Sequence, residues 1–212
     1  YSAAQGLYQQ IINGGGGNES IEYYHAKCSK ELFLSDAILL YHAYIKNYPY
    51  SQFLDKVNED FSLLYFRDKT YDKAILYFNK LPHLQSQNNL IFKFAYANFR
   101  IDSLAESSYY FSKLMHTESK YASTSRYYYA YIAYEKGLYK TALNNFQQLL
   151  DDDKFDAIAP YYITQIYFFQ KNYKQLIVFA KPLIDKVIPS RIAEVNRVLA
   201  EAYYNTQDYK EA

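Results

Sequence analysis

Apolar residues recur along most of the chain at the i, i+3, i+4 spacing of amphipathic helices, and no comparable alternating strand pattern is present. One phrase keeps returning: an aromatic residue or leucine, a small residue three positions on, and usually an aromatic residue four positions later. Clear copies are "YDKAILYF" at 71–78 and "YKTALNNF" at 139–146. The copies begin at Tyr1, Leu34, Tyr71, Leu104, Tyr139, Tyr173 and Tyr209. Successive copies start 33 to 37 residues apart, which is the period of a helical repeat.

A second helical pattern begins about fifteen residues before each phrase, as in "NEDFSLLYFRDK" at 58–69. The repeating unit is therefore a pair of helices of roughly a dozen residues each, joined by a short turn. One pair cannot bury its own apolar face, but stacked pairs can. The pattern predicts a second helix over about 1–13, five complete pairs, and a last first helix over about 191–206. We expect an all-α solenoid that forms one domain over 1–212.

These units resemble the tetratricopeptide repeat (TPR) family, whose repeat is about 34 residues long. The resemblance lies in "LAEAYYNTQDYKEA" at 199–212, "YAYIAYEKGLYKTALNNF" at 129–146 and "DAILLYHAYIKNYP" at 36–49. It implies a right-handed superhelix of antiparallel helix pairs, with a half repeat at each end. Departures from the family pattern are His25 and Thr164 at the small position of the first helix, and Pro182, which should kink or end the second helix of the fifth pair.

The family resemblance also implies which positions of each first helix line the concave inner face, where peptide ligands usually lie. In the first pair these positions carry Glu19, Glu22, Ala26, Ser29 and Lys30. In the later pairs they are largely aromatic, and aromatic residues and arginine dominate binding hot spots. The predicted partner-binding residues are Phe66, Arg67, Phe92, Tyr96, Phe99, Arg100, Tyr127, Tyr131, Tyr134, Tyr161, Phe168 and Phe169.

Two points about this inner face stay open at the level of sequence. A tightly wound solenoid could bury the same rings against one another, and the register is uncertain in the third and fifth pairs. Within the tyrosine-rich segment 126–146, we expect Tyr127, Tyr131 and Tyr134 at the surface and Tyr129 and Tyr139 in the packing. The family's clamp for a chaperone's terminal carboxylate is not expected, because the equivalent positions carry Glu22, Ala26, Glu59 and Leu63.

The candidates for chemistry all favour structural roles. The four histidines, His25, His42, His83 and His116, lack partners at a metal-ligand spacing. His25 falls on a core position, and Cys28 lies beside it on one helical face, so a buried, hydrogen-bonded histidine is favoured over a nucleophile pair. No paired acids, nucleotide loop or Ser/His/Asp set is present. We therefore expect no enzyme, no cofactor and no metal.

Three polar segments have simple structural interpretations. The run "DDDKFD" at 151–156 lacks the turn glycine and closing glutamate of a calcium loop, so we expect it to cap the next helix. Asn18–Ser20 reads as a glycosylation acceptor or a helix start. Gly14–Gly17 is expected to be a connector rather than a phosphate-binding loop, since neither a preceding strand nor a following Lys-Ser/Thr is present.

Composition narrows the partner class. The chain has 28 Tyr, 14 Phe and no Trp, and its net charge is only +1. A nucleic-acid binder usually shows a clear basic excess, so no nucleic-acid partner is expected. No stretch reaches the roughly 20 apolar residues that span a bilayer. Since the chain starts without methionine and stops inside a repeat phrase, we expect a fragment of a longer protein.

The sequence favours a non-catalytic scaffold that binds a partner protein within a larger complex. The stretches "AILLYHAYIKNYPYSQF" and "SKYASTSRYYYAYIAYEKGLYKTALNNFQQLL" look like the bacterial cell-envelope branch of the TPR family, which includes outer-membrane-assembly lipoproteins and Tol–Pal-associated proteins. That resemblance implies a periplasmic or outer-membrane-associated place in envelope assembly or secretion, while a cytoplasmic one stays open. The alternatives are an RNA-binding helical repeat, since stacked rings suit bases, and a regulatory repeat region of a larger enzyme.

Overall fold

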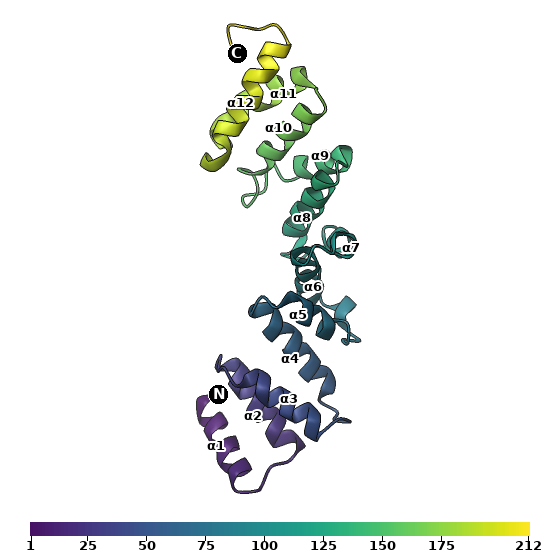
Figure 1. The fold of residues 1–212 in the computed structure, drawn as a ribbon, viewed down its shortest axis with the longest axis vertical. Coiled ribbons are helices and arrows are strands. Elements are labelled where there is room, and N and C mark those ends of the chain that lie inside the picture. Colours follow the sequence, from purple (N-terminus) through teal and green to yellow (C-terminus); the bar gives the residue numbers. More distant parts are fainter. The chain divides into compact units, whose positions relative to one another are not determined.

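The computed structural model describes residues 1–212 and is all-helical, with twelve α-helices and two short 3-10 helices (Figure 1). The chain divides into two compact units, Tyr1–Ser107 and Ser108–Ala212. The predicted helix pairs are confirmed, while the single domain expected over 1–212 stays a prediction. Unit 1 contains α1 (Ser2–Asn13), α2 (Glu19–Glu31), α3 (Ala37–Asn47), α4 (Leu54–Arg67), α5 (Tyr71–Phe78), η1 (Leu84–Ser86) and α6 (Asn88–Arg100). Unit 2 contains α8 (Ala122–Glu135), α9 (Tyr139–Gln147), α10 (Ala159–Phe169), α11 (Tyr173–Ala180), η2 (Lys181–Lys186) and α12 (Pro189–Asn205), and α7 (Leu104–Leu114) crosses the boundary.

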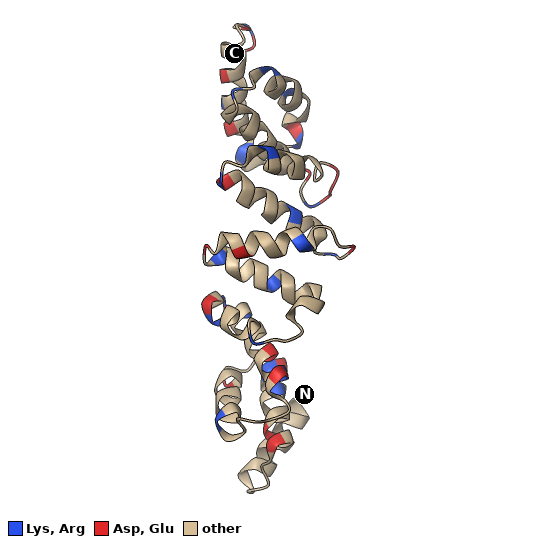
Figure 2. Ribbon diagram, turned by 90° about the vertical axis from the view of Figure 1, so that its right-hand side faces the viewer, with Lys and Arg blue, Asp and Glu red and all other residues tan.

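From α1 to α6 and from α8 to α12, each helix packs against its neighbours in sequence, as α4 does against α5 and α8 against α9. The repeated phrase supplies the second helix of each pair, and its small and aromatic positions form the core: Ala74, Phe78, Ala142 and Phe146 are fully buried. A small residue lets two helix backbones approach closely, and the aromatic ring fills the space beside it. Figure 2 shows acidic and basic residues of both signs along the chain, separated by uncharged stretches.

The first helices of the pairs end in a common turn. The residue after each C-cap has a left-handed backbone, at Phe33, Lys69, Asp102, Gly137, Lys171 and Gln207. In each turn the backbone N–H groups of this residue and the next one donate to carbonyl oxygens of the preceding helix. Lys69 N donates to Phe66 O (3.1 Å) and Thr70 N donates to Tyr65 O (2.9 Å). These are the paired bonds of a Schellman motif. Glycine is the residue best suited to the left-handed conformation, yet only Gly137 is one.

The position of this turn corrects the register of the first pair. The left-handed residue precedes the phrase by two positions at Tyr71, Leu104, Tyr139, Tyr173 and Tyr209, but Phe33 precedes Leu34 by one. The left-handed residue of the first pair thus lies one residue closer to the phrase than in the other pairs, so α2 is displaced by one position. The slip lies in the first pair and not in the third or fifth, where the register had been left open.

Burial supports the corrected register. Toward its C-terminal end, α4 buries Phe61, Ser62, Leu64 and Tyr65. The matching set on α2 is His25, Ala26, Cys28 and Ser29. The small residue of the first pair is therefore Ala26 and not His25. Glu22, Ala26 and Ser29 are not inner-face positions, because the inner positions of α2 are held by Tyr23, Lys27, Lys30 and Glu31.

Other local expectations have mixed outcomes. Helix α11 ends at Ala180 and a 3-10 helix follows, as the position of Pro182 predicted. Asn18 caps α2 by accepting from Ile21 N (3.1 Å), which confirms the helix start. The capping role of the acidic run is wrong: α10 begins after Ile158 without a side-chain cap, and Asp152 instead accepts from Lys154 N within its own loop (3.0 Å). None of the helices combines the length and the apolar character that a membrane crossing requires.

Candidate functional site

In unit 1, helices α4, α5 and α6 bring three aromatic rings and one arginine together. The rings of Phe66, Tyr71 and Tyr96 meet edge to face, with centroids 5.7, 5.9 and 6.0 Å apart. The Arg100 guanidinium lies 5.1 Å from the Tyr71 ring and 5.9 Å from the Tyr96 ring. It donates to the Tyr96 hydroxyl at 3.2 Å and to the Tyr71 hydroxyl at 3.4 Å. We call these four residues the unit 1 aromatic cluster.

The other predicted inner residues of unit 1 lie around this cluster. Phe92 stacks on Tyr96 at 6.5 Å, and Phe99 lies 6.3 Å from the same ring. Arg67 turns away from the cluster: it pairs with Asp68 (3.1 Å) and its guanidinium lies 5.4 Å from the exposed Phe33 ring. The sequence missed Tyr71 as a member, because it was assigned only to the start of a repeat phrase.

In unit 2, Tyr162 on α10 is the centre of the aromatic packing. Its buried ring stacks on Phe146 at 4.7 Å, and Tyr131 and Tyr134 of α8 meet it edge to face at 5.8 and 5.3 Å. Burial, followed by neighbouring phenols, raises the pKa values of Tyr134 and Tyr162 well above the ordinary range. Tyr131 and Tyr134 remain half-buried. The sequence did not single out Tyr162, because the family resemblance gave no inner-face role to its position.

Two of the predicted inner-face rings in unit 2 pack closely against their neighbours. Tyr127 stacks on Phe155 at 4.8 Å and meets Phe146 at 6.2 Å, but it is half-buried like Tyr131 and Tyr134, so its place at the surface stays a prediction. Tyr161 is buried, and its hydroxyl donates to Glu194 of α12 at 2.9 Å. Burial and this hydrogen bond raise the pKa of Tyr161 to about 12. The open alternative, in which the rings are buried, therefore holds for Tyr161.

The remaining rings of unit 2 are more accessible. Phe169 is exposed, stacks on Tyr139 at 5.8 Å and lies 6.2 Å from Tyr134. Phe168 is half-buried, with the Arg197 guanidinium 5.7 Å above its ring. Tyr129 and Tyr139, both expected in the packing, are half-buried. The accessible inner face of unit 2 is thus narrower than predicted.

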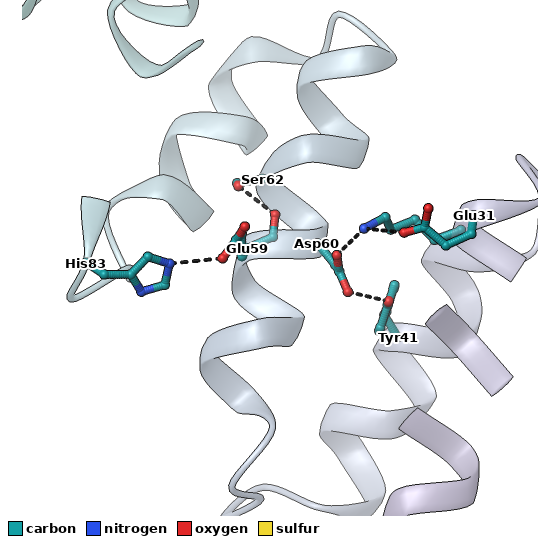
Figure 3. A network of polar contacts seen from close by, with 7 residues as sticks. Glu31, Tyr41, Glu59, Asp60, Ser62 and His83 are labelled. Carbon is teal, nitrogen blue, oxygen red and sulfur yellow. Dashed lines mark hydrogen bonds and ion pairs between the residues drawn. The ribbon is translucent and has the colours of Figure 1, made fainter. Parts of the chain in front are cut away.

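A polar network on α4 links it to α2 and α3 of the first repeat and, through Glu59, to His83 in the segment after α5 (Figure 3). Asp60 is buried, accepts from the Tyr41 hydroxyl of α3 at 2.6 Å, and pairs with Lys30 of α2. Lys30 also pairs with Glu31 at 3.0 Å. Burial alone would lower the pKa of Lys30, but the bonds and charges of Asp60 and Glu31 outweigh it and raise that pKa. No pattern in the sequence marks Asp60, since its partners lie 19 and 30 residues away.

Beside this network, the inner face of the first two pairs is hollowed into a pocket of about 230 Å³. Tyr23 and Leu63 form its apolar part. We call it the lysine pocket, and its charged lining consists of Lys27, Lys30 and Glu31 from α2 and Lys56, Glu59 and Asp60 from α4. The corrected register explains why α2 supplies lysines to this surface, where the sequence had placed Glu22 and Ala26.

The histidine and the cysteine of α2 are both buried. A ring nitrogen of His25 lies 3.4 Å from the Gln5 amide of α1, which confirms a hydrogen-bonded core histidine. Burial lowers the pKa of His25 and raises that of the Cys28 thiol, and a raised pKa is the opposite of what activates a nucleophile. No group of three or more His, Cys, Asp or Glu side chains is arranged to hold a metal ion.

Comparisons with known proteins support the fold. No family model matches the chain, and no curated protein matches it. Among solved structures, the chain is similar to a tetratricopeptide repeat protein from Parabacteroides merdae ATCC 43184, with 13% sequence identity and a TM-score of 0.52. The match covers 100% of this chain and 88% of that one. At this identity the likeness shows the fold alone, and it confirms the TPR-like architecture that the repeat phrase predicted.

Proposed function

We propose that this chain is a non-catalytic scaffold that binds a segment of a partner protein on the inner faces of its repeats. The TPR-like fold is typically a protein-interaction scaffold, and the unit 1 aromatic cluster is the observation that carries the proposal. In this cluster Phe66 and Tyr96 are half-buried and Tyr71 is buried beneath Arg100, and aromatic rings beside arginine are the surface composition in which binding energy concentrates. In unit 2 the corresponding surface is formed by Tyr131, Tyr134, Phe168 and Phe169.

The finer proposal is a role in bacterial envelope assembly or secretion, in the periplasm or at the outer membrane. The envelope-like stretches of the sequence support it. Fractionation of cells carrying a tagged full-length protein would test it, with recovery in the cytoplasmic fraction as the contrary result. The RNA-binding alternative is disfavoured by the near-neutral charge, since phosphate neutralisation dominates such binding.

The binding surface is tested by crosslinked affinity purification and mass spectrometry from the native organism. The inner-face variant carries Tyr96→Ala, Tyr131→Ala and Phe168→Ala. The matched control carries Leu39→Ala, Leu76→Ala and Val178→Ala, which truncate apolar side chains exposed on the second helices α3, α5 and α11. Circular dichroism must show unchanged helicity in both variants. We expect a partner that is lost from the inner-face variant and kept by the control, and equal recovery with both would contradict the proposal.

A further inference from the structure

A second pocket of unit 1 lies between the second helices α1 and α3, away from the inner face. It encloses about 270 Å³, which is less than a typical small-molecule site and suits a single side chain. Helix α2 contributes Glu22, which the corrected register removes from the inner face. We call this the α1–α3 pocket, and its lining consists of Gln9 and Ile12 from α1, Glu22 and His25 from α2, and Leu40, Ala43 and Asn47 from α3.

The α1–α3 pocket contains one negative charge without a counter-ion. The Glu22 carboxylate accepts hydrogen bonds from the Tyr48 hydroxyl at 2.8 Å and from the Asn47 amide at 3.2 Å, and both donors are neutral. Burial lowers the pKa of His25, so its ring adds no positive charge at neutral pH. Helix α1 has no charged side chain, and Lys46, in the last turn of α3, makes no ion pair. A cation entering the pocket would therefore displace no existing partner of Glu22.

The amides beside this charge present acceptors. The side-chain nitrogen of Gln9 donates to Asn13 Oδ1 at 2.9 Å, and that of Asn47 donates to Glu22. The carbonyl oxygens of the same two amides, Gln9 Oε1 and Asn47 Oδ1, accept no hydrogen bond within the protein. A carboxylate can accept about four hydrogen bonds, so Glu22 retains capacity as well. The pocket thus offers three acceptors around one negative charge.

The glycine connector between α1 and α2 borders the charged end of the pocket. A Cβ atom at Gly17 would lie 3.2 Å from Glu22 Oε1 and 3.9 Å from Ile12 Cγ1. The first of these distances is tighter than most Cβ contacts, so a side chain at this position would press on the carboxylate. Glycine lets the connector pass beside Glu22, whose two oxygens are bound from α3 and its C-cap residue Tyr48.

We propose that the α1–α3 pocket binds the side chain of a lysine from a partner protein. Its ammonium pairs with Glu22, and its methylene groups contact the apolar lining of Ile12, Leu40 and Ala43. The three N–H donors of an ammonium diverge, so they can reach the carboxylate and the two amide oxygens together. An arginine fits less well, because its planar fork binds a carboxylate best through both oxygens, and both oxygens of Glu22 already accept.

This inference goes beyond the proposed function, since it adds a contact on the second helices and gives the charge of the group that makes it. The test is a titration of the whole chain followed by ¹H–¹⁵N NMR. The probe is Nα-acetyl-lysine N-methylamide. Its neutral control is the norleucine equivalent, which keeps the methylene chain and lacks the ammonium. The arginine equivalent is the third probe.

Two variants of the pocket are compared with a matched control. Glu22→Gln removes the charge and keeps the size of the side chain. Its control is Glu19→Gln, which removes the other acidic side chain in the first turn of α2 and lies outside the lining. Ala43→Leu fills the pocket from an exposed position of α3, where added volume does not disturb the core. Circular dichroism must show unchanged helicity in all three.

We expect the lysine probe to give saturable shifts in the amides of α1, α2 and α3, and the norleucine probe to give none. Glu22→Gln should weaken binding about fivefold, as the loss of an ion pair at the upper end of the surface range does, while Glu19→Gln leaves it unchanged. Ala43→Leu should abolish the shifts, and added salt should weaken binding. The proposal is overturned by absent saturation with the lysine probe, by equal shifts from norleucine, by tighter binding of the arginine probe, or by equal effects of the two glutamate variants.

The two proposals fail separately. The inner-face variant changes no residue of the α1–α3 pocket, so loss of the scaffold proposal in the crosslinking experiment would not alter the shifts in α1, α2 and α3. Conversely, failure of the lysine probe would leave the aromatic inner face untouched.

Discussion

Replacing Asp60 with asparagine tests how strongly the polar network ties α4 to the first repeat. The side chain of Asp60 is only 9% exposed and the residue Tyr41 is fully buried, so water screens their contact little. Asparagine keeps the shape but turns a charge-assisted bond to Tyr41 into a neutral one, which costs about 1 kcal/mol. The substitution also removes the ion pair between Asp60 and Lys30. The Lys30 side chain is 18% exposed and still pairs with Glu31, so the loss of the Asp60 pair should cost about 1–2 kcal/mol. The chain should therefore lose about 2–3 kcal/mol of unfolding free energy.

The assay is urea unfolding at neutral pH followed by circular dichroism, with hydrogen exchange to locate the effect. Protection should fall in α2, α3 and α4 first, because those helices contain the partners. Asp55→Asn is the matched control: it lies on the same helix, is exposed, and should cost no more than about 0.5 kcal/mol through the helix dipole. The double variant with Tyr41→Phe should cost less than the sum of the two single variants. If Asp60→Asn costs no more than Asp55→Asn, the network is solvated and the reasoning fails.

Two further predictions concern the turns and the buried histidine. Gly137 has φ 70° and open space at its Cβ position, so Gly137→Ala should cost about 1 kcal/mol through the backbone alone. Lys171 has φ 54°, so the Lys171→Gly variant should be more stable than the Lys171→Ala variant by a similar amount. Equal urea midpoints for glycine and alanine at either site would refute this. Burial lowers the pKa of His25 in the folded chain, so on acidification the unfolded chain takes up a proton first. The contribution of neutral His25 to the free energy of unfolding is therefore fully present above its ordinary pKa of 6.5, and it is lost as the pH falls through the lower folded value. His25→Gln should therefore reduce the loss of thermal stability between about pH 7.5 and pH 5, and an unchanged difference would show that other groups cause it.

The second helices could be predicted from the sequence almost completely. Their phrase combines a small residue and an aromatic ring that must both be buried for two helices to pack, so Ala74, Phe78, Ala142 and Phe146 were identifiable without a structure. The first helices were placed only by their distance from the phrase. That distance depends on where the left-handed residue of the turn falls. At Phe33 it lies one position closer to the phrase, which leaves no signal in a chain where five of the six equivalent left-handed residues are not glycine.

The aromatic inner face was predicted in kind but not in detail. Residue type predicted that aromatic rings would gather on α4, α6, α8 and α10. It could not distinguish a ring at the edge of the core from a ring that faces solvent. Tyr127 and Tyr131 are four residues apart on one face of α8, yet Phe155 from the following loop stacks on the first of them. That contact depends on the path of the loop at 151–158, and the sequence had assigned the same loop to helix capping.

The one-residue slip in α2 changes the inner face more than it changes the core. A shift of one position turns a helix by about 100°, which exchanges the residues on the inner face for those beside them. In the first pair this exchange replaces Glu22 and Ala26 by Tyr23 and Lys27, and so replaces an acidic surface by one that carries an unpaired ammonium. The core tolerates the exchange, because Ala26 still supplies the small residue where α2 packs. The charge of the inner face in the first pair therefore depends on where the turn at Phe33 falls relative to the repeat phrase.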